Sequence, residues 1–141
     1  MRILIIDGQG GNIGSQLIKI MREELPQAEL IAVGTNAIAT QNMLKAGCPQ
    51  AATGENATIT QAKRADIIVG PIGIMVADAL LGEVSPAMAQ AVAQSDAYKI
   101  LIPMNKCEIL IAGINNVPTS KLLTDAIAKI RDLCKISDAN I

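Results

Sequence analysis

The chain has 141 residues, half of them hydrophobic, with 12 basic and 13 acidic side chains and a formal net charge of −1. It contains no His, Phe or Trp and a single Tyr, so it lacks the basic surface and the stacking aromatic residues on which nucleic-acid binding depends. The absence of His and the wide spacing of the three Cys residues also leave no recognisable metal-binding motif.

In the first half of the chain, short apolar runs alternate with segments of helical period. Residues 2–6 form an apolar run after one charge, which is typical of a buried parallel strand. Apolar residues then recur at every fourth position from Ile13 to Leu25, which predicts a helix that ends before Pro26. The following patterns predict strands at 29–33 and 51–53 and helices at 36–46 and 58–65.

The second half continues this alternation. Ser85 followed by Pro86 is typical of an N-cap and a first helical position, so a helix is expected over 86–95. A last helix is expected from Thr119, because apolar residues form one stripe from there to Cys134. The other expected elements are strands at 67–70, 98–103 and 108–112 and a helix at 74–81.

This order of elements predicts an α/β fold of the three-layer, Rossmann-like type, with a doubly wound, mostly parallel sheet and helices on both faces. We expect residues 1–141 to form a single domain. The most apolar stretch, Ile67 to Leu81, is too short to span a bilayer and contains Asp78. With no leader sequence at its start and an odd number of scattered Cys residues, the chain is expected to be a cytoplasmic bacterial protein with no membrane partner.

Small and polar residues gather where the predicted strands end. The ligand crevice of a doubly wound sheet lies outside the carboxyl ends of its strands, and these ends read DGQGG, GTN, TGEN, GPIG and PMNKC. Their convergence predicts a binding site there. The residues expected to form it are Asp7, Gly8, Gly10, Gly11, Asn12, Ile13, Gly14, Gly34, Thr35, Asn36, Thr53, Gly54, Glu55, Asn56, Gly70, Pro71, Asn105 and Lys106.

The glycine loop is the strongest local signal. Gly8, Gly11 and Gly14 have the spacing G-x-x-G-x-x-G between a predicted strand and a predicted helix, whose N-terminus would attract an anion. The run IIDGQGGNIGSQLI resembles the glycine turn of extended short-chain dehydrogenases and NmrA-like proteins, which implies binding of NAD(P) or another nucleotide. The same glycines would also suit a plain tight turn, and Asp7 would either cap that turn or contact the ligand.

Two departures from those enzymes argue against a dehydrogenase. Their Tyr and Lys lie four residues apart, whereas here Tyr98 is followed directly by Lys99. The second strand ends in Gly34-Thr35-Asn36, without the acidic residue that would hold a ribose diol or the Arg that would hold a 2′-phosphate. The loop therefore predicts a phosphate site and no particular reaction.

Three longer segments, TGENA, KRADIIVGPIGI and LIPMNKC, extend the resemblance over nearly the whole chain. In these segments the chain resembles an uncharacterised family of small bacterial proteins that is known mainly from anaerobic Firmicutes. The resemblance implies a Rossmann-like fold and a cytoplasmic setting. It implies no activity and no catalytic residues.

Three functions remain open on this reading. The first is a homo-oligomer that senses or carries a nucleotide or another small phosphorylated ligand. The second is a small enzyme that acts on a phosphorylated metabolite or nucleoside, with Asp7, Asn105 and Lys106 in its site. The third is an assembly protein without a ligand, in which helices between Met75 and Met88 form the interface and Asp78 faces another subunit.

Overall fold

The computed structural model describes residues 1–104 and 108–140. Its centre is one sheet of five parallel strands in the order β3-β2-β1-β4-β5. The strand order reverses between β1 and β4, so the switch point of this doubly wound sheet lies at the carboxyl ends of these two strands. The strands are β1 (Arg2–Asp7), β2 (Glu29–Gly34), β3 (Gln50–Thr53), β4 (Ile67–Pro71) and β5 (Tyr98–Ile102).

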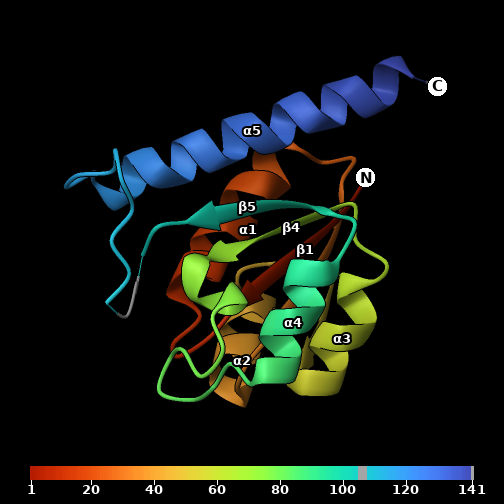
Figure 1. The fold of residues 1–141 in the computed structure, drawn as a ribbon. Coiled ribbons are helices and arrows are strands. Elements are labelled where there is room, and N and C mark those ends of the chain that lie inside the picture. Colours follow the sequence, from red (N-terminus) through yellow and green to blue (C-terminus); the bar gives the residue numbers. More distant parts are fainter. Residues whose placement is uncertain (105–107, 141) are drawn as a thin grey trace.

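Helices cover both faces of the sheet (Figure 1). One face packs against α1 (Asn12–Glu24), α2 (Ala37–Lys45) and α5 (Thr119–Ala139). The other packs against α3 (Glu55–Ala62), the short 3-10 helix η1 (Ile72–Met75) and α4 (Pro86–Gln94), and α3 and α4 lie side by side. The predicted three-layer, Rossmann-like fold is therefore confirmed.

Strand β1 shows why the sheet needs this double cover. Its residues Ile3 to Ile6 are all fully buried, and successive side chains point to opposite faces. Ile3 and Ile5 belong to the core beneath α1 and α5, whereas Leu4 and Ile6 belong to the core beneath α3 and α4. A continuous apolar run is stable in water only if both faces are covered.

The helix boundaries follow capping signals in the sequence. Ser85 Oγ accepts a hydrogen bond of 3.2 Å from the Met88 N–H, with Pro86 at the first position of α4, as predicted. Asn36 Oδ1 accepts a bond of 2.9 Å from the Ala39 N–H and caps α2 in the same way. No helix among the described residues is both long enough and apolar enough to cross a bilayer.

The helix predicted over 74–81 is wrong. After η1 the chain turns repeatedly, and Asp78, Leu80 and Leu81 adopt positive φ angles of 65°, 56° and 58°, which end any helix. The apolar residues of this segment instead form a small cluster with Met88 of α4. Asp78 is therefore an exposed turn residue, and the next α-helix begins only at Pro86.

The strand predicted over 108–112 is also wrong, because among the described residues the sheet ends at β5. Residues 108–118 form turns and irregular backbone, and Glu108 at their start has a positive φ of 65°. Ile111 and Ile114 line a groove between β5 and α5, whereas Leu110 is 92% exposed. The apolar pattern reflects packing against this groove rather than pairing in the sheet.

Candidate functional site

Asp7 joins the end of β1 to the start of α1. Its side chain is buried, with Oδ1 accepting a hydrogen bond of 2.8 Å from the Gly8 N–H and Oδ2 one of 2.8 Å from the Gly14 N–H. Burial raises the pKa of Asp7, although these backbone hydrogen bonds oppose the rise. Asp7 thus caps the turn, and two donors that a ligand phosphate would use are already engaged by it.

The glycines of the loop allow α1 to pack tightly on its neighbours. Gly11 has a φ of +69°, and a Cβ atom there would lie 2.8 Å from the carbonyl oxygen of Ala39. A Cβ atom on Gly14 would lie 2.6 Å from the sulfur of Met43. At Gly10, by contrast, a Cβ atom would meet nothing within 4 Å. Gly11 and Gly14 therefore serve the fold, whereas the surface at Gly10 is open.

Three hydrogen-bond donors next to the loop converge on one oxygen, Oε1 of Glu83. They are the backbone N–H of Gln9 at 2.9 Å, the hydroxyl of Thr35 at 2.7 Å and the side-chain amide of Asn36 at 2.7 Å. We call these three donors the cradle. Burial alone would raise the pKa of Glu83, but the hydrogen bonds outweigh it, so its pKa lies below the ordinary value and the group is a carboxylate at neutral pH.

Thr35 and Asn36 were predicted in the site, whereas Glu83 was not. Glu83 reaches the cradle from the segment between β4 and α4, 74 positions along the chain from Gln9. No local spacing or motif marks it. Its place depends on the turns that replace the predicted helix.

On the other side of the turn, a polar cavity of about 280 Å³ lies between α1 and α2. The backbone N–H groups of Gly10 and Asn12 have no partner among the described residues, and Lys19 and Lys45 are the only charged side chains of the lining. The Ser15 hydroxyl is buried without a hydrogen-bond partner. The full lining is Gly10, Asn12, Ser15, Lys19, Asn42, Lys45 and Ala46.

The sequence predicted only Gly10 and Asn12 of this cavity. A further signal was present, because Asn12, Ser15 and Lys19 follow each other at helical spacing on the face that starts at the glycine loop. Asn42 and Lys45 belong to α2 and join the cavity through packing, with Asn42 donating a hydrogen bond of 2.8 Å to the Gly10 carbonyl.

The remaining predicted residues lie along the same edge of the sheet with structural contacts of their own. Thr53 hydrogen-bonds Thr40 at 2.7 Å, and Glu55 accepts a bond of 2.6 Å from the Ser85 hydroxyl. Gly34 packs closely on Thr40, and Gly70 on the backbone of Ile6. Ile13 of α1 belongs to the hydrophobic core, and Pro71 is buried at the end of β4. Gly54 is the N-cap of α3, and Asn56 is exposed in the first turn of that helix. Asn105 and Lys106 lie outside the described residues.

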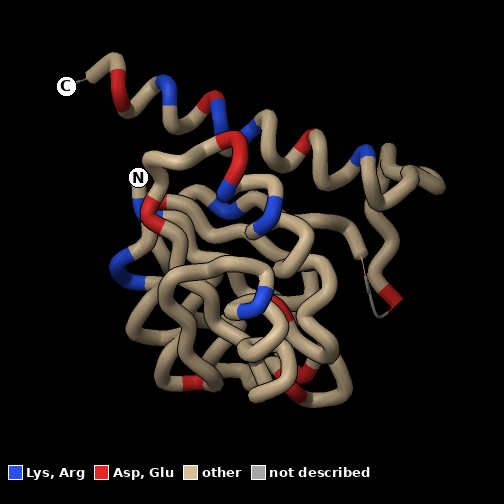
Figure 2. Tube along the Cα trace, turned by 180° about the vertical axis from the view of Figure 1, so that it is seen from behind, with Lys and Arg blue, Asp and Glu red and all other residues tan. Residues whose placement is uncertain are grey.

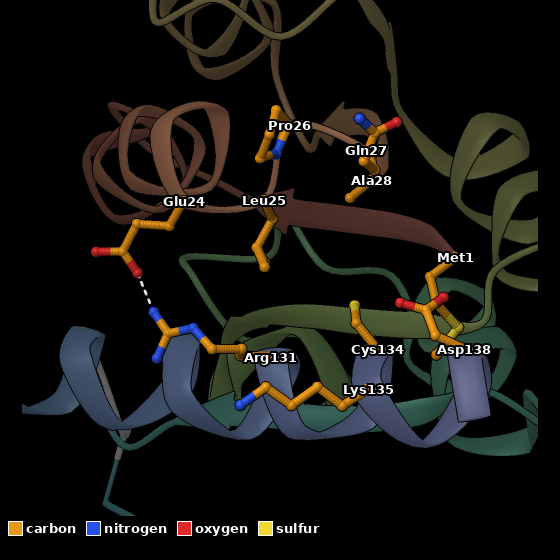
Figure 3. Close-up of a pocket in the computed structure, with 10 residues that line it drawn as sticks. All are labelled: Met1, Glu24, Leu25, Pro26, Gln27, Ala28, Arg131, Cys134, Lys135 and Asp138. Atoms are coloured by element: carbon orange, nitrogen blue, oxygen red, sulfur yellow. Dashed lines mark hydrogen bonds and ion pairs between the residues drawn. The ribbon is translucent and has the colours of Figure 1, made fainter.

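A second cavity, of about 240 Å³, lies at the opposite, amino edge of the sheet (Figure 3). Arg131 of α5 pairs with Glu24 across its mouth, and burial raises the pKa of the Cys134 thiol, so the thiol is neutral at physiological pH. The lining is Met1, Glu24, Leu25, Pro26, Gln27, Ala28, Arg131, Cys134, Lys135 and Asp138. None of these belongs to the predicted site.

Residues 2–135 match the family described as "Domain of unknown function (DUF3842)". The chain belongs to this family. Among curated proteins, none matches it. A dodecameric FMN-dependent UbiX-like decarboxylase from Escherichia coli O157:H7 is similar in structure, with 15% sequence identity, a TM-score of 0.43 and coverage of 96% of this chain and 94% of that one.

Charge separates the two sides of the glycine turn in this DUF3842 protein. Glu83 places a carboxylate on the side of the cradle, and Lys19 and Lys45 place two cations on the side of the cavity. Elsewhere acidic and basic residues are interspersed, most regularly along α5 (Figure 2). Among the described residues, no group of three or more His, Cys, Asp or Glu side chains is arranged to hold a metal ion.

Proposed function

We propose that this protein binds a nucleotide or another phosphorylated small molecule at the glycine loop, with a phosphate between the start of α1 and the two lysines. The observation that carries the proposal is that Gly10 and Asn12, whose N–H groups have no partner among the described residues, line one cavity with Lys19 and Lys45. A helix N-terminus and lysine side chains both attract phosphate, and here residues of both line the same cavity.

The size of the cavity sets how the ligand would lie. At about 280 Å³ it is close to the lower end of ligand pockets, roughly 300–1,000 Å³, so it suits a phosphate group better than a whole nucleotide. The rest of the ligand would cross the turn toward Thr35 and Asn36 at the end of β2. The ligands that we propose are NAD(P) or a mononucleotide, and the role would be to sense or carry the ligand in the cytoplasm.

Binding of defined phosphate compounds tests the proposal. Isothermal titration would use pyrophosphate, AMP, NAD and NADP with the wild type and with Lys19→Gln combined with Lys45→Gln. We expect at least one compound to bind, and the double variant to bind it about tenfold or more weakly, because a hydrogen bond to a charged group contributes on the order of 1.5 kcal/mol or more.

The matched control is Lys63→Gln combined with Lys121→Gln, which removes the same charge from two exposed lysines away from the cavity. Its affinity should remain that of the wild type. The proposal fails if no compound binds the wild type, or if both double variants lose affinity equally.

We also propose that the protein is a homo-oligomer. Exposed apolar side chains lie on the segment that follows the edge strand β5, at Leu110, Ile114 and Val117. An unpaired strand edge next to exposed apolar residues favours association with another chain.

A further inference from the structure

We propose that residues 76–84 form a lid over the glycine turn, and that the Glu83 carboxylate is an internal anion that a ligand must displace from the cradle. This inference rests on the function proposed above and concerns the part of the ligand that crosses the turn toward Thr35 and Asn36. It names no new ligand. In this role, the Glu83 carboxylate competes with the ligand for the three donors of the cradle.

The first support is the coordination of Glu83. Its Oε1 atom accepts three hydrogen bonds, and the donors come from the loop after β1 and from the loop after β2. Convergent donors of this kind are what an anionic oxygen of a bound ligand requires. Because the carboxylate holds all three, they are unavailable to a ligand in the closed state.

The second support is the fit of the lid on the turn. A Cβ atom on Gly8 would lie 2.6 Å from Cδ1 of Leu80 and 3.1 Å from Oε1 of Glu83. Leu80 is itself buried at 2% exposure. The lid therefore rests directly on the glycine turn, and no phosphate group would fit between them without movement.

The third support is that the lid has few bonds to the site it covers. Its own backbone bonds hold it together, with the Asp78 N–H donating to the Val84 carbonyl at 2.7 Å and the Gly82 N–H to the Asp78 carbonyl at 3.1 Å. Its apolar residues pack in a small cluster with Met88 and Ala89 of α4, separate from the two main cores. Among the described residues, every hydrogen bond from the lid to the loops after β1 and β2 ends on Glu83.

The fourth support is the backbone of the lid. Three of its non-glycine residues, Asp78, Leu80 and Leu81, have positive φ angles, a conformation that leucine rarely adopts. Such strain persists only where surrounding contacts enforce it, and it is common in segments that switch between two arrangements. Leu81 contributes no compensating contact, because its side chain is 96% exposed.

These observations define two states of the site. In the closed state the Glu83 carboxylate occupies the cradle, and in the open state the Gln9 N–H, the Thr35 hydroxyl and the Asn36 amide are free for a ligand. No covalent step is involved. Since only the open state binds, the apparent affinity equals the intrinsic affinity multiplied by the open fraction. A change that weakens the Glu83 contact must therefore strengthen binding.

The test compares Glu83→Gln with the wild type by titration with NAD and with AMP, ligands long enough to extend from the cavity to the cradle. Gln keeps the size of the side chain but removes the charge that attracts the three donors and repels the ligand. We expect the variant to bind about tenfold more tightly, because the closed state loses its charge-assisted hydrogen bonds to Glu83 and the open fraction rises. Glu83→Ala, which removes the contact altogether, should show a gain at least as large.

The matched control is Glu55→Gln. It removes one negative charge near the lid, because Glu55 binds Ser85 at the lid's end, but Glu55 does not touch the cradle. Its affinity should stay that of the wild type. If Glu55→Gln gains as much as Glu83→Gln, general charge explains the effect and the lid is disproved.

The outcomes separate the two proposals. If the wild type binds a probe and neither Glu83 variant binds it more tightly, the lid is overturned while the binding function stands. If no variant binds either probe, the binding function itself is lost. Hydrogen exchange gives an independent readout, since AMP should speed exchange of the Gly82 and Val84 amides in the wild type. Unchanged or slower exchange there would contradict displacement of the lid.

Discussion

At the scale of single residues, two carboxylates divide the donors of the glycine loop. Asp7 takes the N–H groups of Gly8 and Gly14, and Glu83 takes that of Gln9. Asp7 could be predicted because it adjoins the loop in sequence. Glu83 could not, because only the folded chain brings it there. Gly10 and Asn12 line the cavity together with the two lysines, which is why that side of the turn is our choice for a phosphate.

Gly11 is the glycine of the loop whose loss should harm the fold most directly. With φ at +69° and the Ala39 carbonyl 2.8 Å from any added Cβ atom, Gly11→Ala should lower the free energy of unfolding. We expect a loss on the order of 2 kcal/mol in urea denaturation, because strain and overpacking act together. Gly10→Ala is the control, since its Cβ atom meets nothing, and equal losses in both variants would refute the explanation.

The pH dependence of stability should report on Glu83. Its folded-state pKa lies below the ordinary value, so between the two values the unfolded chain binds more protons. Its contribution to the free energy of unfolding is therefore complete above the ordinary pKa of Glu and is lost as the pH falls through the lowered pKa.

Urea denaturation of the wild type and of Glu83→Gln, from neutral pH to about pH 3, isolates this contribution from other titrating groups. The stability difference between the two proteins should shrink as the pH falls. Burial raises the pKa of Asp7 and thus acts with the opposite sign, but Asp7 is present in both proteins. A difference that grows on acidification would contradict the assignment.

At the scale of elements, capping residues predict where a helix lies better than apolar content does. Ser85-Pro86 starts α4 where predicted, because an N-cap is decided by residues that are neighbours in sequence. The apolar residues at 74–81 predict a helix, yet this segment forms a series of turns whose apolar side chains pack on α4. Apolar content alone does not distinguish these two ways of burying the same residues.

Ser85→Ala tests how much this cap contributes. The variant loses the bond to the Met88 N–H and the bond to Glu55, so we expect the free energy of unfolding to fall by about 1 kcal/mol. Thermal or urea unfolding followed by circular dichroism would measure it. Ser120→Ala, at an exposed position in the first turn of α5, should change stability little; a comparable loss there would remove the evidence for the cap.

At the scale of the whole molecule, the strand order places the glycine loop at the carboxyl edge and the second cavity at the amino edge. The edge strand β5 has no neighbour among the described residues on its outer side, and the segment 108–118 beside it exposes apolar side chains. The ligand binding and the self-association that we propose therefore use different surfaces. The two activities should therefore be separable by mutation.

Leu110→Glu should weaken self-association, because Leu110 is 92% exposed beside the β5 edge and a charge there would oppose burial against another chain. Light scattering coupled to size-exclusion chromatography should show an oligomer for the wild type and a lower mass for the variant. Ile38→Glu, on the exposed side of α2, is the control and should keep the wild-type mass. A monomeric wild type would refute the proposed oligomer.

The sequence by itself determined the layers of this protein. Buried parallel strands and amphipathic helices leave local periodic patterns, so β1, β2, β4 and α1 could be recognised from residues close together along the chain. Only the tertiary structure decided what occupies the crevice. The turns at residues 76–84, the Glu83 contact and the pairing of α1 with Lys45 depend on contacts between distant segments, and such contacts have no period in the sequence.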